Sequence, residues 1–302
     1  MKTPIAFIIF NRPDTTLKVF NRIREIKPAQ LFVIADGARN YKEGELERCQ
    51  QVRGIIDLID WECELSTNYS DINLGCKKRI STGLNWVFSK VEEAIILEDD
   101  CLPHPSFFKF CEELLNRYRD DQRIFTISGD NFQFGKQRTN YSYYFSLYNH
   151  CWGWATWRRA WQHYDVEMKL WETICDRNWL NDIFQNPFIA RYWHHKFQET
   201  YTGKIDTWDY QWTLACWLQS GLTILPNLNL VSNIGFDHDA STHTKNQNSP
   251  FANMPAETMQ FPLQHPPFII RDTQADNFTY RKMFSLWSRT SRKLQELVQI
   301  KL

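Results

Sequence analysis

The feature that most constrains this chain is an alternation of short apolar runs with amphipathic stretches through its first 130 residues. Each run is followed by a segment whose apolar residues recur at helical spacing. Buried strands that alternate with helices predict a mostly parallel sheet covered on both faces. We therefore expect an α/β fold with a Rossmann-like, mostly parallel central sheet flanked by helices. The expected strands lie at 5–10, 31–37, 63–68 and 94–97, and the helices at 14–26, 44–60, 75–91 and 105–121.

The chain departs from this alternation after about residue 130 and becomes rich in aromatic residues. Aromatic side chains make up 15% of the sequence, and most of them must be core because large rings dominate burial. A minority could line a site for a sugar ring or a base. We expect an irregular, aromatic stretch at 131–186, a helix at 186–203 that leads into a segment at 204–221, a strand and an exposed loop at 222–243, and irregular structure at 244–276.

Charge and cysteine usage limit the class of protein. The 35 basic and 35 acidic residues balance, so no basic surface for nucleic acid is expected. The eight cysteines are scattered without metal-ligand spacing, which favours free cytosolic thiols. The first apolar run is too short for a signal sequence, and no stretch reaches the length of a membrane span. These features predict a cytoplasmic protein, with the inner membrane face as a second location.

Polar residues follow each of the first four expected strands. In parallel α/β sheets, ligands bind at the carboxyl ends of the strands, so these residues should face one crevice. They are Asn11 and Arg12 after the first strand, Asp36 after the second, Asn73 after the third, and Glu98, Asp99 and Asp100 after the fourth.

The three adjacent acids favour a divalent cation. Neighbouring carboxylates repel each other, and Mn²⁺ or Mg²⁺ in nucleotide enzymes takes one or two carboxylates together with substrate phosphates. Alternation along an extended segment puts Glu98 and Asp100 on one side and Asp99 on the other. A solvated acidic turn is the alternative, but it need not follow a buried strand.

The segment IILEDDCLPHPSFFKF resembles the Glu-Asp-Asp segment of N-acetylglucosaminyltransferase type I and related nucleotide-sugar glycosyltransferases of the GT-A fold. The resemblance runs in order through roughly the first 240 residues. It implies that Arg12 contacts the nucleotide and that Asp36 contacts the base. CWGWATWRRAW is similar to the family's Gly-Trp segment on the acceptor side, and DTWDYQW to its Trp-Asp catalytic segment. An extra residue in DTWDYQW leaves open whether Asp206 or Asp209 is the base.

The residues themselves suggest roles around a sugar nucleotide. Asp100 is the expected metal ligand, Asp99 reaches ribose or sugar hydroxyls, and Glu98 orients Asp100 or accepts from the sugar. Asp36 offers an acceptor to the N3–H of uracil or thymine, although a turn former is nearly as good an interpretation.

Two further side chains are candidates for the donor site. Arg12 lies near the nucleotide in this scheme, and its alternative is a surface arginine. Lys77, at a helix start close to Asn73, could approach the phosphates, or it belongs to a solvated basic face.

Transfer requires a carboxylate that takes the acceptor proton on the face opposite the leaving group. Asp209, between two aromatic residues, is the expected base, and Asp206 is the substitute or a helix cap. The expected acceptor side holds Trp152, Trp154 and Trp208. Downstream, His243 or His238 could be a second metal ligand, with a polar surface loop as the alternative.

These expectations combine into a metal-dependent inverting glycosyltransferase that uses a UDP- or dTDP-sugar and a glycan or lipid-linked acceptor. Residues 1–130 would form the nucleotide-sugar-binding half, 131–243 the acceptor-binding and catalytic half of the same domain, and 244–302 an irregular segment with a basic C-terminal helix. A sugar nucleotidyltransferase and a non-catalytic carbohydrate-binding protein are the alternatives. The C-terminal helix either packs on the domain or contacts anionic lipid.

Overall fold

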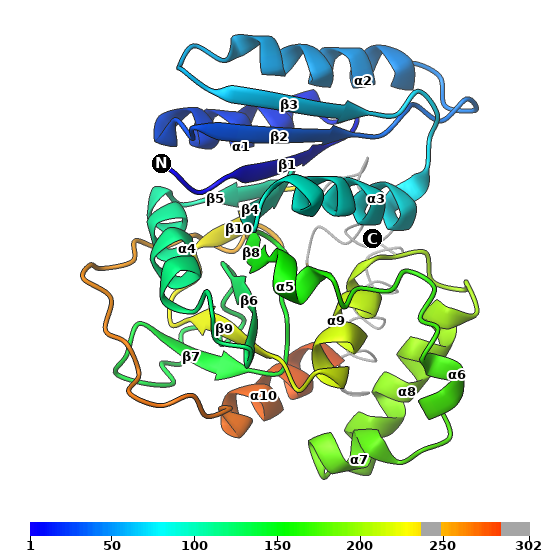
Figure 1. Ribbon diagram of the computed structural model, residues 1–302, viewed down its shortest axis with the longest axis vertical. Helices are drawn as coiled ribbons and strands as arrows, with labels where there is room; N and C mark the ends of the chain where they lie inside the picture. The colour runs from blue at the N-terminus through cyan, green and yellow to red at the C-terminus, as the bar shows by residue number, and fades with distance from the viewer. Residues whose placement is uncertain (237–248, 285–302) are drawn as a thin grey trace, which may run out of the picture.

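The computed structural model of the chain describes residues 1–236 and 249–284, which contain an eight-stranded sheet flanked by helices (Figure 1). The strands are β1 Ile5–Ile9, β2 Gln30–Ala35, β3 Glu64–Tyr69, β4 Glu93–Glu98, β5 Cys101–Pro103, β6 Ile124–Ser128, β7 Tyr143–Ser146, β8 Trp154–Trp157, β9 Leu222–Pro226 and β10 Val231–Asn233. The helices are α1 Pro13–Ile26, α2 Glu45–Gly54, α3 Gly75–Lys90, α4 Pro105–Arg117, α5 Arg158–Trp161, α6 Trp171–Ile174, α7 Trp179–Phe184, α8 Pro187–Tyr201, α9 Asp209–Leu218 and α10 Thr273–Thr279, with single turns at Ile55–Leu58 and Tyr280–Phe284.

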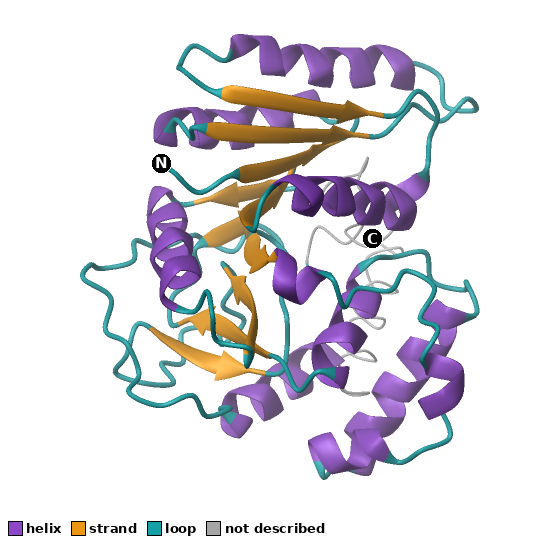
Figure 2. Ribbon diagram, viewed as in Figure 1, coloured by secondary structure: helices purple, strands orange, loops and turns teal. Residues whose placement is uncertain are grey.

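The central sheet has the strand order β3-β2-β1-β4-β8-β6-β9-β7. The first four strands are parallel, β8 runs antiparallel between β4 and β6, and β7 is an antiparallel edge strand. The predicted fold class is confirmed, because a mostly parallel sheet lies between helices (Figure 2) and the second half holds the aromatic clusters. The sequence did not predict that β8, from the aromatic stretch, joins the middle of this sheet.

Side chains of the buried strands point alternately to the two faces of the sheet and form part of one hydrophobic core on each face. In β1, Phe7 packs with residues of α1, α2 and α4 on one face, whereas Ala6 and Ile8 pack with α3, α8 and α9 on the other. The edge strand β3 departs from the expected buried pattern, since its residues are partly or fully exposed and Leu65 is 43% exposed. A strand at the edge of a sheet has one neighbour fewer, which leaves room for its polar sequence.

The segment after residue 248 returns along the edge of the sheet. Of the stretch expected to be irregular, 249–272 lacks helices and strands apart from a single bridge between Arg271 and Phe145, but 273–276 belong to helix α10, which Asp272 caps by accepting from Ala275 N. The carboxylate of Asp276 in α10 is buried and accepts from Ser146 Oγ at 2.5 Å and from Arg271 Nε at 2.6 Å. These contacts fasten α10 to β7.

Some of the predictions from the sequence concern residues that the structure does not describe. They include His238 and His243 and most of the basic C-terminal helix, since 237–248 and 285–302 are not described. In the remaining residues, no helix is long and apolar enough to span a membrane.

Candidate functional site

The loops that follow β1, β2, β3 and β4 lie together at one edge of the sheet. The register pairs Ile9 with Ala35, Ala35 with Tyr69, and Ile8 with Glu98, so these four strands end at nearly the same level. The polar residues predicted from the sequence therefore lie at one edge of the sheet, the edge at which parallel α/β sheets bind ligands.

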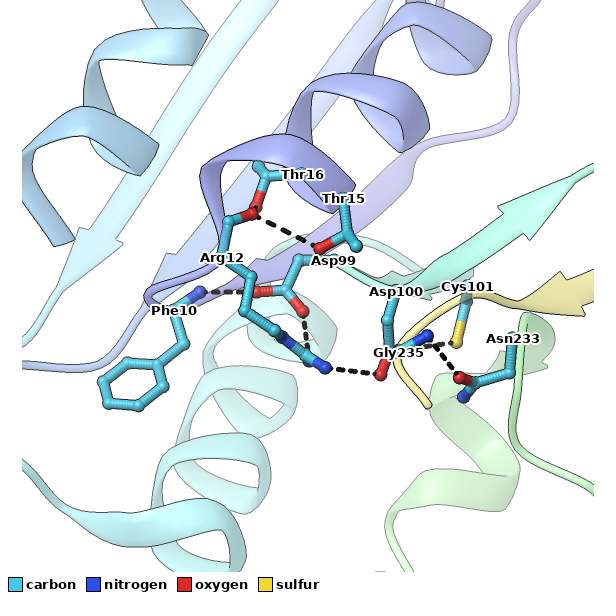
Figure 3. A network of polar contacts seen from close by, with 9 residues as sticks. All are labelled: Phe10, Arg12, Thr15, Thr16, Asp99, Asp100, Cys101, Asn233 and Gly235. Atoms are coloured by element: carbon cyan, nitrogen blue, oxygen red, sulfur yellow. Dashed lines mark hydrogen bonds and ion pairs between the residues drawn. The ribbon is translucent and has the colours of Figure 1, made fainter. Parts of the chain in front are cut away.

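Arg12 bridges the two aspartates that follow β4 (Figure 3). Its Nη2 contacts Asp99 Oδ1, and its Nη1 donates to Asp100 Oδ2 at 2.8 Å. The other oxygen of Asp99 accepts from the backbone N–H of Phe10 at 3.0 Å. Burial acts to lower the pKa of Arg12, but Asp99 and Asp100 raise it above its usual value. The guanidinium is thus a fixed positive charge at this site.

This arrangement corrects two expectations. Asp99 does not face away from Asp100, because β4 ends at Glu98 and the two aspartates lie in a turn where alternation no longer holds. Charge repulsion between these aspartates also does not require a metal ion, because Arg12 already compensates them. The sequence had placed Arg12 beside the nucleotide and had not paired it with the acids.

Glu98 has no such partner. No hydrogen bond from a described residue reaches its carboxylate. Burial raises the pKa of Glu98 well above its usual range, and the charges of Asp100 and Asp99 raise it further. Asp209 adds to the same effect from across the crevice. Glu98 is therefore the acid at this edge that is left available to a ligand.

Asp36 organises the loop that leads into α3. Its Oδ1 accepts from Leu74 N at 2.9 Å and Gly37 N at 3.0 Å, and its Oδ2 accepts from Gly75 N at 3.0 Å and Asn73 Nδ2 at 3.1 Å. Burial raises the pKa of Asp36, and the backbone donors act against that rise. Asp36 and Asn73, both predicted to bind the donor, hold one another and the start of α3. A contact of Asp36 with a base stays a prediction.

Gly37 shows how tightly these two loops pack. A Cβ at this position would lie 2.5 Å from the backbone carbon of Ile72, so a larger residue would separate the loops after β2 and β3. Lys77, in the first turns of α3, is partly exposed, and no hydrogen bond or ion pair to it is seen in the described part of the chain. The ammonium group of Lys77 is therefore available to bind an anion.

Asn11 belongs to a second network that the sequence did not reveal. Its Nδ2 donates to Glu45 Oε1 at 2.8 Å, while Glu45 Oε2 accepts from Arg39 N at 2.7 Å and Arg39 Nε at 2.9 Å. Burial of Glu45 acts to raise its pKa, but the bonds from Arg39 and Asn11 lower it to about 2. Asn11 therefore ties the end of β1 to the loop after β2. A fully buried acid could not have been recognised in the polar sequence ELERCQQ.

The predicted base, Asp209, is the first residue of helix α9 and is close enough to the end of β4 for its charge to act on Glu98. Its Oδ1 accepts from the hydroxyl of Thr207, and its charge raises the pKa of Glu98 and of Cys76. A carboxylate in the first turn of a helix is stabilised by the positive end of the helix dipole. Asp206 is also nearby, since its Oδ2 lies 3.4 Å from the position of a Cβ on Gly75. Asp206 does not cap α9, because the N-cap residue is Trp208.

Three residues at this site were not identified from the sequence. Tyr164 stacks on Trp161 with ring centroids 4.3 Å apart, and its buried hydroxyl has no hydrogen-bond partner within the described residues. Burial raises the pKa of Tyr164, and the nearby charge of Asp209 raises it further. Cys76 and Cys151 also lie near the acids. Burial raises the pKa of both thiols, and the charges of Glu98 and Asp209 raise it further. Cys151 opens the segment CWGWATWRRAW, but nothing in the sequence singled out these three side chains themselves.

The tryptophans predicted on the acceptor side are mostly core. Trp154 and Trp208 are 1% and 3% exposed and stack on each other with centroids 5.4 Å apart. They therefore offer no open ring face to a sugar, because each face is covered by the other ring or by neighbours such as Trp212. Trp152 is partly buried and packs against Phe132 and Phe236.

The donor atoms at the β4 end fit a divalent cation that receives most of its ligands from a substrate. Within 1–236 and 249–284, no three His, Cys, Asp or Glu side chains form a group that could hold a metal ion alone. Among the described residues, Glu98 has no hydrogen-bond partner, and Asp100 Oδ1 is contacted only by the thiol of Cys101, at 3.4 Å. Two hard carboxylate oxygens with further oxygens from a diphosphate suit Mg²⁺ or Mn²⁺.

No protein-family model matches the chain, and no curated protein sequence matches it. Among solved structures, the chain is similar to the galactosyltransferase LgtC in complex with donor and acceptor sugar analogues, at 11% identity over 70% of each chain with a TM-score of 0.37. It is also similar to a UDP-glucose pyrophosphorylase complexed with UDP-glucose, at 13% identity over 44% of this chain and 64% of that one, with a TM-score of 0.26. A 4-diphosphocytidyl-2C-methyl-D-erythritol synthase from Anaerococcus prevotii matches at 7% identity over 57% of this chain and 76% of that one, with a TM-score of 0.33. These likenesses are weak, and the function has to be argued from the site.

Proposed function

We propose that the chain is a metal-dependent inverting glycosyltransferase that moves a hexosyl or N-acetylhexosaminyl group from a UDP- or dTDP-sugar to a hydroxyl of a glycan or lipid-linked acceptor. The observation that carries the proposal is that the start of α9 lies beside the strand ends: Asp206 Oδ2 lies 3.4 Å from the position of a Cβ on Gly75, in the loop that Asp36 holds, and the charge of Asp209 raises the pKa of Glu98. In this proposal Asp209 acts as the base, and Glu98 and Asp100 hold the metal ion and the donor.

The donor side uses the residues of the strand ends. Glu98 and Asp100 would hold Mn²⁺ or Mg²⁺, which supplies positive charge to a departing diphosphate. Arg12 and Lys77 provide further positive charge near it. Asp99 is already bonded to Arg12 and Phe10, so it acts by fixing Arg12. Asp36 and Asn73 shape the loop beneath the nucleoside.

The transfer step follows from the position of Asp209. Its carboxylate takes the proton from the acceptor hydroxyl as the acceptor oxygen bonds to the anomeric carbon. The bond from that carbon to the diphosphate breaks, and the leaving oxygen keeps the electron pair. A single displacement with one base inverts the anomeric configuration. Trp208, the residue directly before Asp209, is buried and would keep water from that side of the base.

A calorimetric titration tests the donor part of the proposal. UDP, dTDP, CDP, GDP and ADP are titrated into the full chain, with and without Mn²⁺. UDP or dTDP should bind, and more tightly with Mn²⁺, whereas the other three should bind weakly. Equal binding of all five nucleotides, or binding of none of them, would remove the basis for a UDP- or dTDP-sugar enzyme.

A further inference from the structure

The guanidinium of Arg12 bonds to Asp100 Oδ2, an oxygen that a cation bound to Asp100 would also use. Its Nη1 lies 2.8 Å from Asp100 Oδ2, and the side chain of Arg12 is only 19% exposed (Figure 3). Gly235 covers the same contact, because a Cβ on Gly235 would lie 2.7 Å from Arg12 Nη1. The ion pair is therefore enclosed, and little water screens it.

The backbone and the side-chain end of Arg12 are held in different ways. The carbonyl of Arg12 accepts from Thr16 N at 3.0 Å and from Thr16 Oγ1 at 2.6 Å, which fixes it to the first turn of α1. Within the described residues, the guanidinium bonds only to Asp99 and Asp100. A stronger anion that enters the crevice can thus take over its N–H groups without moving the helix.

We propose that Arg12 is a resident counter-ion that couples the binding of a nucleoside diphosphate to the binding of a divalent cation. This inference rests on the proposed function. A diphosphate offers the guanidinium two strong acceptors in the fork geometry it prefers. When Arg12 turns toward the diphosphate, Asp100 loses its counter-ion and gains affinity for Mn²⁺ or Mg²⁺.

The coupling predicts an unusual effect of mutation: loss of a residue from the site should strengthen binding of the cation instead of weakening it. With no nucleotide present, removal of the guanidinium should strengthen cation binding, because Asp100 Oδ2 becomes free and its negative charge uncompensated. The same change should weaken nucleotide binding. By thermodynamic linkage, the factor by which UDP strengthens Mn²⁺ binding equals the factor by which Mn²⁺ strengthens UDP binding. Both should fall when Arg12 is replaced.

The experiment measures free Mn²⁺ by electron paramagnetic resonance in titrations of the full chain, with and without UDP, corrected for Mn²⁺ bound by UDP alone. The variant is Arg12→Gln, and the matched control is Arg24→Gln. Arg24 lies in the last turn of the same helix and pairs with exposed Asp60. The control removes one positive charge away from the crevice. Asp100→Asn identifies the Mn²⁺ that is bound at this site.

We expect nucleotide-free Arg12→Gln to bind Mn²⁺ about fivefold or more tightly than the parent chain, and the coupling factor with UDP to fall by a similar amount. Arg24→Gln should leave both unchanged. If Arg12→Gln fails to fold, as judged by circular dichroism, Arg12→Lys decides the question. Lysine keeps the positive charge but lacks the planar fork that bonds both aspartates at once, so it should hold Asp100 less firmly, and the effect should have the same direction and be smaller.

Unchanged or weaker Mn²⁺ binding by a folded, nucleotide-free Arg12 variant would overturn the coupling. This outcome differs from failure of the proposed function, in which the parent chain itself binds neither UDP nor Mn²⁺. If the parent chain binds both ligands and UDP does not strengthen Mn²⁺ binding, the proposed function survives and the role of Arg12 does not.

Discussion

Gly235 lies directly against the carboxylate of Asp100, so that a Cβ at position 235 would be 2.2 Å from Asp100 Oδ2. Gly235 is also held by its own N–H, which donates to Asn233 Oδ1 at 2.9 Å. The chain that follows β10 therefore closes over the ion pair of Arg12 and Asp100. It comes this close because residue 235 has no side chain.

We expect Gly235→Ala to push Asp100 and Arg12 apart. Overpacking of an enclosed contact costs about 1–3 kcal/mol, so the urea midpoint should fall and UDP should bind more weakly. The matched control is Gly54→Ala, because no atom lies within 4 Å of a Cβ at that helical position. There alanine should stabilise by about 0.5–1 kcal/mol. Equal stability of Gly235→Ala and the parent chain would show that the segment moves away without cost.

Asp209→Asn should bind UDP as the parent chain does and lose transfer by about 10²- to 10⁴-fold, because the amide cannot take a proton. Thr207 can still donate to the remaining oxygen, so the local geometry should persist. Single-turnover transfer and UDP calorimetry measure the two effects separately. Asp206→Asn is the matched control and should be mild. The reverse order of effects would make Asp206 the base.

Much of this site could be predicted because it follows from local pattern and one topological rule. The run AIIL ahead of Glu98 predicts a buried strand, and parallel strands that end together bring Asp36 and Arg12 to the same crevice. The sequence alone therefore predicts at which edge of the sheet a loop residue lies.

The partners of these residues could not be predicted in the same way. Arg12 and Asp99 are 87 positions apart, and no period in the sequence encodes their contact. Trp154 and Trp208 were expected to flank a sugar, but the insertion of β8 between β4 and β6 buries them together. Which rings of an aromatic segment are buried depends on contacts with segments that are distant in the sequence.

Tyr164→Phe tests a residue that only the structure reveals. The hydroxyl is buried without a hydrogen-bond partner among the described residues, so its removal should not lower the free energy of unfolding. If the hydroxyl bonds a substrate beside Asp209, transfer should fall about tenfold, which is the effect of one hydrogen bond lost in the transition state. Tyr144→Phe is the matched control, a buried tyrosine on the edge strand β7. Equal activity of the two variants would exclude a role for Tyr164 in the reaction.

Glu45 should make the stability of the fold depend on pH below 5. Its carboxyl is fully buried, and Arg39 and Asn11 lower its pKa to about 2 from an ordinary value of 4.5. A group whose pKa is lower in the folded state stabilises the fold above its ordinary pKa and loses that contribution as the pH falls toward the folded value. A depression of this size corresponds to about 3 kcal/mol.

Glu45→Gln should therefore be less stable than the parent chain at pH 7, and the difference should shrink as the pH falls from about 4.5 to about 2. Urea unfolding at a series of pH values measures the difference directly, so that other titrating acids cancel. Glu25→Gln, which removes an exposed acid paired with Arg22, should stay within about 0.5 kcal/mol of the parent chain at every pH. A difference between Glu45→Gln and the parent chain that is constant with pH would mean that packing, rather than the charge of Glu45, holds the loop after β2 to the end of β1.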